Sequence, residues 1–167
     1  MKKVILIRHG KSDWNKMASD VDRPLSTKGV SDVFKVSDFI SNYLPEKFVV
    51  WSSIAKRAKD TALIFAQNLS IPIETIIFKN ELYTFESDAL ETCIKNCDNK
   101  YSNLVLFGHN DAILNFVNKF TGKSLKNVPT SSFISISFSN SDWQSIQKGD
   151  LEHAIFPKQI KNERIKT

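Results

Sequence analysis

The sequence predicts an α/β fold, a three-layer sandwich in which helices cover both faces of a mostly parallel central sheet. Short apolar runs, typical of strands buried on both faces, recur along the chain, and stretches with helical periodicity lie between them. The length of 167 residues, with 41% hydrophobic and 25% charged residues, suits one globular domain, and no linker or repeat divides it. We therefore expect a single domain over residues 1–167, of which about the last eight residues form a frayed tail.

Five segments are expected to be strands. Val4–Ile7 is a continuous apolar run, and further β-rich runs cover residues 48–51, 73–78, 104–107 and 133–138. In the last of these, apolar residues alternate with Ser, so this strand has one wetter face or lies near an edge of the sheet.

Four segments are expected to be helices. The apolar residues of the first fall within an arc of about 120°; they are Val30, Val33, Phe34, Ile40 and Leu44. Ser26 or Thr27 would cap this helix, and Pro45 lies just beyond it. A second helix covers residues 58–69, a third lies at 113–120 and stops at Gly122, and a fourth runs from Ser87 to about Cys97.

Composition narrows the class of partner and the compartment. The chain has 23 Lys and Arg against 18 Asp and Glu, a net charge of +5, which favours anionic partners. Nucleic acid is not expected, because the lysines are scattered and the basic segment 158–166 contains an acid and no aromatic residue. No run approaches the roughly 18 apolar residues of a membrane span, and two cysteines cannot form a disulfide framework. We expect a cytoplasmic protein that does not bind membranes.

Histidines and cations follow the predicted strands. Arg8-His9-Gly10 comes directly after the first strand, Arg57 follows the second, and Gly108-His109-Asn110 follows the fourth. In sheets of this class, ligands bind at the carboxyl ends of the strands. The sequence therefore predicts that these side chains meet in one site.

Their chemistry indicates phosphoryl transfer through a histidine nucleophile. A neutral imidazole can attack phosphorus and form a covalent phosphohistidine, while fixed cations hold the charged phosphoryl oxygens. Arg8, Arg57 and a protonated His109 would supply those cations, so His9 and His109 are expected to titrate apart. Gly10 would let the backbone approach the phosphate closely. We expect no metal, because the arginines would repel a cation, and no organic cofactor.

Three motifs resemble those of the histidine phosphatase superfamily, also called phosphoglycerate mutase-like. Arg8-His9-Gly10 is similar to its first motif, residues 53–62 to its second-arginine motif, and residues 105–110 to its second-histidine motif. Asp22-Arg23-Pro24-Leu25, followed by Lys28-Gly29, further resembles the small SixA-like phosphohistidine phosphatase branch. The resemblance implies that His9 is the nucleophile and that Arg8, Arg57 and His109 complete the phosphate pocket.

The resemblance also implies further contacts and a substrate class. Asn15 and Asn110 would bind the substrate, and the general acid would be Glu81, with Glu86 or Asp88 as alternatives. Phosphohistidine has a good leaving group and depends less on an acid than a sugar phosphate does. We therefore expect hydrolysis of a phosphorylated substrate, with protein phosphohistidine as the first choice. The alternative is a broad small-molecule phosphomonoesterase, and a more distant one is a non-catalytic protein that binds phospho-groups or nucleic acid.

Overall fold

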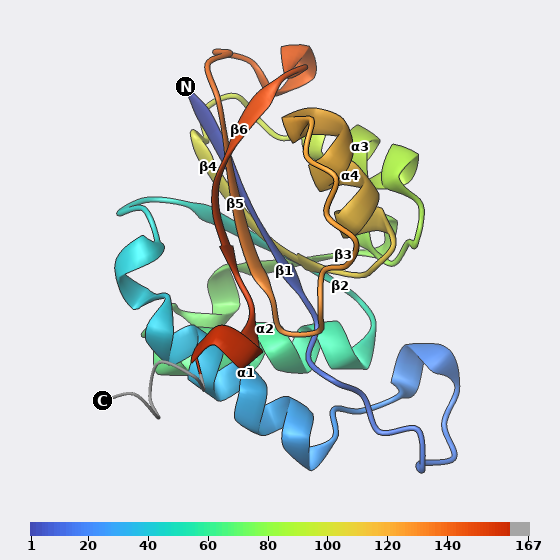
Figure 1. Cartoon of the computed structure of the whole chain (residues 1–167). Helices are drawn as coiled ribbons and strands as arrows, with labels where there is room; N and C mark the ends of the chain where they lie inside the picture. The colour runs from blue at the N-terminus through green and yellow to red at the C-terminus, as the bar shows by residue number, and fades with distance from the viewer. Residues whose placement is uncertain (161–167) are drawn as a thin grey trace.

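A six-stranded sheet forms the centre of the computed structural model, which describes residues 1–160 (Figure 1). Nearly all of the predicted tail lies outside the described residues. The strands are β1 (Lys2–Arg8), β2 (Val49–Ser53), β3 (Ile76–Lys79), β4 (Asn103–Gly108), β5 (Phe133–Phe138) and β6 (Gly149–Ile155). The helices are α1 (Thr27–Phe39), α2 (Lys56–Asn68), α3 (Ser87–Lys95) and α4 (Ala112–Thr121).

The sheet has the order β3-β2-β4-β1-β5-β6 and is mostly parallel, as predicted. β1 pairs in parallel with β4, and β2 pairs in parallel with both β4 and β3. β5 is antiparallel to both β1 and β6. β6 was not predicted from the sequence, because most of its side chains are exposed or half-buried and include Asp150, Glu152 and His153.

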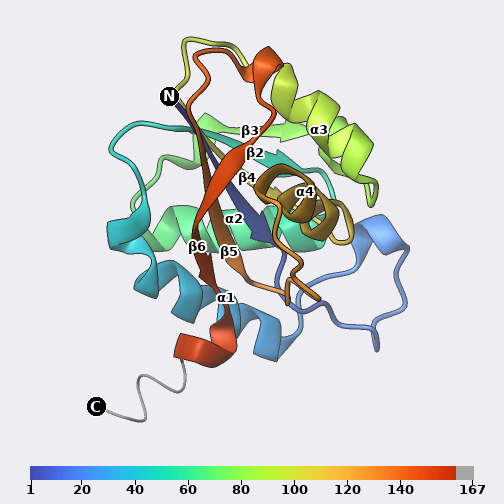
Figure 2. The same ribbon diagram turned by 45° about the horizontal axis from the view of Figure 1, so that its top comes forward.

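The continuous apolar run of β1 is buried on both faces of the sheet. Val4 and Leu6 belong to the core that α3 and α4 cover, while Ile5 and Ile7 belong to the core beneath α1 and α2 (Figure 2). All four side chains are 0% exposed. This arrangement confirms the predicted three layers, and it leaves the carboxyl ends of the strands free to form a site.

The buried face of α1 differs from the predicted arc. Val33 and Ile40 are buried as predicted, but Val30 and Phe34 are 45% and 54% exposed, so their predicted burial is wrong. Val36, which lies outside the predicted arc, is buried instead. The inner face is rotated away from Val30 and Phe34 because the helix packs on α2 and the sheet through positions that include the polar Asp32. Of the two predicted caps, Ser26 is the residue used, and its Oγ accepts a hydrogen bond from the Gly29 N–H at 3.0 Å.

The other helices agree with the sequence. α2 buries Ala58, Ala62, Phe65 and Ala66, and α4 buries its predicted apolar side and ends at Gly122, whose φ is 69°. Cys93 and Cys97 are buried free thiols. None of the described helices has the length and apolar character needed to cross a membrane.

The first turn of α1 is pressed against the loop that leaves β1. Both the backbone N–H and the Oγ–H of Ser26 donate to the carbonyl of Lys11, at 2.9 and 3.1 Å. A Cβ added to Gly29 would lie 2.1 Å from the same carbonyl oxygen, far inside van der Waals contact. The loop after β1 can therefore keep its position only with glycine at residue 29.

We predict that Gly29→Ala destabilises the protein by about 1 to 3 kcal/mol, measured by urea denaturation. Helix propensity alone would predict that Gly29→Ala stabilises the protein, because alanine is favoured over glycine in a helix by about 1 kcal/mol. Ser31→Ala, at an exposed position of the same helix, is the matched control and should change stability little. Equal stability of Gly29→Ala and the wild type would contradict the close contact.

Candidate active site

The predicted residues come together at the carboxyl ends of three neighbouring strands. His9 follows β1, Arg57 lies in the first turn of α2 after β2, and His109 follows β4. A cavity of about 360 Å³ opens here, lined by His9, Arg8, Arg57 and Asn110 among others. A larger cavity of about 520 Å³ lies among residues 46–48 and 100–103, where β2 and β4 begin, and contains no predicted site residue.

His9 has one unprotonated ring nitrogen. Its Nδ1 lies 2.7 Å from the carbonyl oxygen of Gly10, to which it donates, so the unprotonated nitrogen is Nε2. The Nε–H of Arg57 points at that Nε2 from 3.4 Å. Burial, followed by the positive charges of Arg57 and Arg8, lowers the pKa of His9 to about 3. His9 is therefore neutral at physiological pH, as a nucleophile must be.

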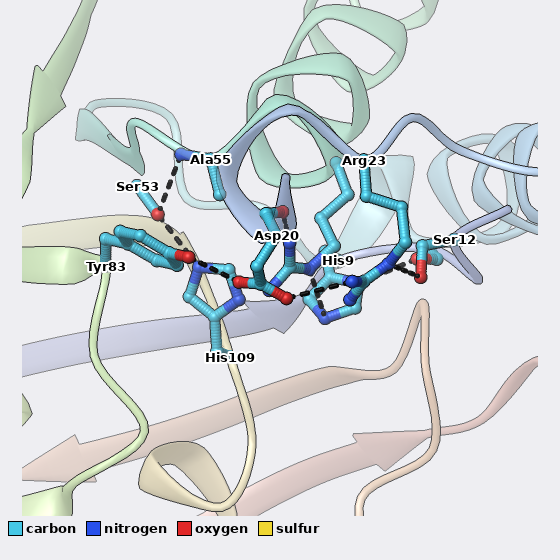
Figure 3. A network of polar contacts seen from close by, with 10 residues as sticks. His9, Ser12, Asp20, Arg23, Ser53, Ala55, Tyr83 and His109 are labelled. Carbon is cyan, nitrogen blue, oxygen red and sulfur yellow. Dashed lines mark hydrogen bonds and ion pairs between the residues drawn. The ribbon is translucent and has the colours of Figure 1, made fainter. Parts of the chain in front are cut away.

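His109 is positioned by a serine. Its ring centroid lies 5.2 Å from that of His9, and its Nε2 lies 2.8 Å from the Oγ of Ser53. That Oγ accepts a hydrogen bond from the Ala55 N–H at 3.2 Å (Figure 3). The serine hydroxyl then has one proton left to donate, and it donates this proton to His109 Nε2. The remaining proton of His109 is then on Nδ1, which is buried and has no partner among the described residues.

The expected positive charge on His109 is not found. Burial and the charges of its neighbours, with His9 and Arg57 first among them, lower the pKa of His109 to about 3. The prediction that the two imidazoles titrate apart is therefore wrong for the protein by itself, because both lose the hydration that would stabilise a cation. A neutral His109 still has an Nδ1–H to donate, so it can serve as a phosphate ligand without a charge.

The two predicted arginines differ in how they are held. Arg57 is 2% exposed, and its Nη1 donates to the backbone oxygen of Asp20 at 2.6 Å. Arg8 donates from Nη1 to the carbonyl of Val128 at 2.8 Å, while its Nε is buried without a partner among the described residues. Arg8 Nε–H and His109 Nδ1–H are thus two buried donors close to His9 that a phosphoryl group could use.

Asp20 was missed by sequence reasoning, although it lies at the centre of the network (Figure 3). Its carboxylate accepts hydrogen bonds from the Tyr83 hydroxyl, from Arg57 Nη2 at 3.2 Å and from Arg23 Nη1 at 2.9 Å. The Tyr83 hydrogen bond, together with the charge of Arg57, lowers the pKa of Asp20 to about 2. Asp20 stands in a short 3-10 turn, η1 (Asp20–Asp22), and nothing in its spacing singles it out.

Arg23 and Tyr83 belong to segments that the sequence did single out. Arg23 is buried, donates from Nε to Ser12 Oγ at 2.9 Å, and lies 3.5 Å over the ring of Trp14. The segment 80–86 contains the predicted acid Glu81 and its alternative Glu86, but the aromatic residues of this segment are the ones that reach the site. Tyr83 and Phe85 each have a ring centroid 5.5 Å from that of His109.

Glu81 is not brought to this site. It is exposed and lines a separate cavity of about 430 Å³ together with Lys79 and Cys93. Glu81 lies in the 3-10 turn η4 (Asn80–Leu82), which buries Leu82 in the core. Tyr83, directly after this turn, is therefore the residue that reaches Asp20. The alternatives Glu86 and Asp88 are exposed and do not line the catalytic cavity either.

The three predicted substrate ligands are placed differently. Asn110 lines the cavity, and its Nδ2 donates to the carbonyl of Val128 at 3.0 Å. Asn15 is exposed and does not line the cavity. Gly10 does not line it either: a Cβ there would lie 2.6 Å from Val33 Cγ2, so this glycine allows α1 to pack closely rather than the backbone to approach a phosphate.

Metal ligands are not clustered at this site or elsewhere in residues 1–160, where no three His, Cys, Asp or Glu side chains come together in a way that could hold an ion. The donors of the cavity are instead arginine, lysine and amide groups, which are suited to an anion.

The two imidazoles should make stability depend on pH. Their pKa values are lowered from 6.5 to about 3, so between these limits the unfolded chain binds more protons than the folded one. The free energy of unfolding must therefore fall as the pH is lowered through this window. We predict a loss of about 1 to 2 kcal/mol per imidazole between pH 7 and 5, measured by urea denaturation.

His109→Asn should reduce this loss by about half. His153→Asn is the matched control, because His153 is an exposed residue of β6 that packs on the ring of Tyr43. If the free energy of unfolding depended on pH in His109→Asn as it does in the wild type, the lowered pKa of His109 would be contradicted.

Comparison with known proteins agrees with this geometry. The model of the histidine phosphatase superfamily (branch 1) matches residues 4–82. The uncharacterized phosphatase PhoE of Bacillus subtilis is 34% identical over 110 residues, which cover 62% of this chain and 56% of PhoE.

Two solved structures share the fold over nearly the whole chain. The proposed phosphohistidine phosphatase SixA of Agrobacterium tumefaciens is 21% identical with a TM-score of 0.78, covering 93% of this chain and 98% of its own. The protein histidine phosphatase SixA solved with tungstate is 20% identical with a TM-score of 0.79, covering 95% and 99%. Sequence and structure together thus agree with the resemblance of the three motifs to the histidine phosphatase superfamily, whose model matches residues 4–82.

Proposed function

We propose that this protein is a phosphatase that removes the phosphoryl group from a protein phosphohistidine by way of phosphorylated His9. One observation carries the choice of substrate. Among the described residues, Asp20 is the one carboxylate that lines the catalytic cavity, and its pKa is lowered to about 2. The cavity therefore has cations for the phosphoryl oxygens but no carboxylic acid that is protonated at neutral pH.

The missing acid restricts the leaving group. An alkoxide needs a proton in the transition state, and general acid catalysis typically contributes about 10² to 10⁴-fold. Asp20 cannot provide that proton because Tyr83, Arg57 and Arg23 hold it as the anion. A phosphohistidine that is protonated on its other ring nitrogen releases a neutral imidazole, which needs no further proton.

The proposed reaction has two displacements at phosphorus. The lone pair of His9 Nε2 forms a bond to phosphorus while the substrate P–N bond breaks, and that electron pair returns to the leaving imidazole. Arg57, Arg8 and the Nδ1–H of His109 donate to the phosphoryl oxygens. Water then displaces His9 from phosphorus, its proton passes to solvent, and inorganic phosphate leaves the neutral imidazole ready for another cycle.

The mouth of the cavity supports a macromolecular substrate. Trp14 and Phe85, which line it, are 74% and 49% exposed, and exposed aromatic side chains are favoured at protein interfaces. The SixA structure that shares this fold was solved with tungstate, a tetrahedral oxyanion like phosphate. The exposed aromatic residues support a protein as the substrate, and the tungstate complex supports binding of a phosphoryl group.

We predict that kcat/KM falls steeply as the leaving group becomes more basic. The values of kcat/KM should span at least about 10²-fold across a panel of phosphohistidine peptide, acyl phosphate, aryl phosphate and sugar phosphate, and the sugar phosphate should be the slowest substrate. His9→Ala should abolish turnover of all four. Equal rates for the sugar phosphate and the phosphohistidine peptide would favour the alternative, a broad phosphomonoesterase.

Two carboxylate variants test the missing acid directly. Glu81→Gln should leave the whole panel unchanged, because Glu81 lies on another cavity. Asp20→Asn should slow all substrates by a similar factor, through the altered hold on Arg57. A loss confined to alkyl phosphates in either variant would identify that residue as the acid.

We predict that Ser53→Ala lowers kcat/KM for phosphohistidine about tenfold or more, because His109 loses the partner that keeps its proton on Nδ1. Ser52→Ala is the matched control: this neighbour is equally buried, but its Oγ bonds to the backbone oxygen of Ser53. Histidine ¹⁵N NMR should show the Nδ1–H form of His109 in the wild type and lose it only in Ser53→Ala. An Nε2–H form in the wild type would contradict the assignment.

A further inference from the structure

A second cavity adjoins the catalytic one. It has a volume of about 350 Å³ and shares two lining residues, Lys11 and Thr130, with the cavity that contains His9. Its other lining residues come from α1, from the segment after β6 and, in Pro129, from the loop before β5. The two cavities therefore meet at Lys11 and Thr130, and a substrate bound at His9 that extends past these residues reaches the second cavity.

The wall between the two cavities is fixed to the catalytic strand. The Ser131 N–H, next to Thr130, donates to the carbonyl oxygens of both Arg8 and His9 at 3.1 Å. On the other side, the carbonyl of Lys11 is held by Ser26 at the start of α1. The distance between a group on His9 and a group in the second cavity is thus set by backbone hydrogen bonds.

Positive charge concentrates around the two cavities. Together they are lined by six cationic side chains and two carboxylates, in a chain whose net charge is +5. In the second cavity, Lys28 is paired with the buried Asp32 at 3.2 Å. Within residues 1–160, neither Lys11 nor Lys158 has an ion-pair partner. These two lysines therefore carry the charge that an anionic ligand can use.

The remaining surface of the second cavity is apolar. Pro129, Phe156 and Pro157 supply it, and each of the three lysines around it is exposed. No arginine and no buried cation is present to cradle a compact phosphate. Exposed ammonium groups around an apolar surface instead fit a polypeptide segment that carries carboxylates and an apolar side chain.

We propose that this cavity is a docking subsite for an acidic segment next to the phosphohistidine of a protein substrate. The segment places its carboxylates at Lys11 and Lys158 and an apolar side chain on Pro157 and its neighbours. This inference rests on the proposed function and deepens it, because it names the sequence character of the preferred substrate.

A pair of synthetic phosphohistidine peptides tests the subsite. One carries Asp and Glu beside the phosphohistidine, and the other has Asn and Gln at the same positions. For the wild type we expect kcat/KM to be about fivefold or more higher on the acidic peptide, mainly through KM. This ratio should fall as ionic strength is raised, because the contributing lysines are exposed to solvent.

Lysine variants locate the effect. In Lys158→Glu the ratio between the two peptides should fall to about one or below, because Lys158 is one of the two lysines at which the proposal places the carboxylates. Lys11 is left intact in this test because it also lines the catalytic cavity. Lys148→Glu, an equal charge reversal at the opposite end of β6 from Lys158, is the matched control and should keep the wild-type ratio.

The outcomes separate this inference from the proposed function. Hydrolysis of neither peptide would overturn the proposed function itself. Hydrolysis of both at equal rates by the wild type would overturn the subsite and leave the function standing. Butane-1,4-diol bisphosphate is added as a competitor. If its inhibition is lost in Lys158→Glu while the ratio between the two peptides keeps its wild-type value, the acidic segment is overturned in favour of a small bisphosphate.

Discussion

The contact between Arg57 Nε–H and His9 Nε2 is the feature on which the rest of the site depends. Burial of the imidazole, and then a cation 3.4 Å from its nitrogen, keep that nitrogen unprotonated, and in the proposed reaction the same cation meets the incoming phosphoryl oxygens. The contact requires α2 to be held firmly against the loop after β1. Thr61 does this with one hydroxyl, which donates to the Arg57 carbonyl at 2.7 Å and accepts the Gly10 N–H at 2.9 Å. Fold and nucleophile are thus joined through a single buried side chain.

Burying Arg57 at 2% exposure requires an anion nearby, and Asp20 supplies it. The same ion pair that stabilises the arginine removes Asp20 from acid catalysis, since a carboxylate held by Tyr83 and two arginines does not carry a proton near neutral pH. In the proposed function, substrate choice therefore follows from charge balance inside the protein. A site built in this way favours leaving groups that need no proton from the enzyme.

The residues that could be predicted from the sequence are those whose position follows from local pattern. His9 and His109 directly follow apolar runs, and Arg57 lies in the first turn of the helix that follows a third apolar run. Parallel pairing of the three strands therefore brings these residues together. Asp20 and Tyr83 could not be found in this way. They meet across 63 positions of sequence, and neither the turn around Asp20 nor the one before Tyr83 has a distinctive pattern. The wrong choice of Glu81 has the same origin, because only the packing of Leu82 decides which neighbour faces the site.

The charge of His109 was mispredicted for a physical reason that also explains how the site can work without it. Four cationic side chains and one carboxylate line the catalytic cavity, a surplus of three positive charges. That surplus already exceeds the charge of a phosphoryl dianion, so a further cation would add repulsion between neighbours to the loss of hydration on burial. In the proposed reaction, a neutral imidazole with its proton on Nδ1 contributes direction instead, as a buried donor that needs no rearrangement when the phosphoryl group arrives. The basic character of the sequence is thus concentrated where the chemistry takes place, and histidine is used there for geometry and arginine for charge.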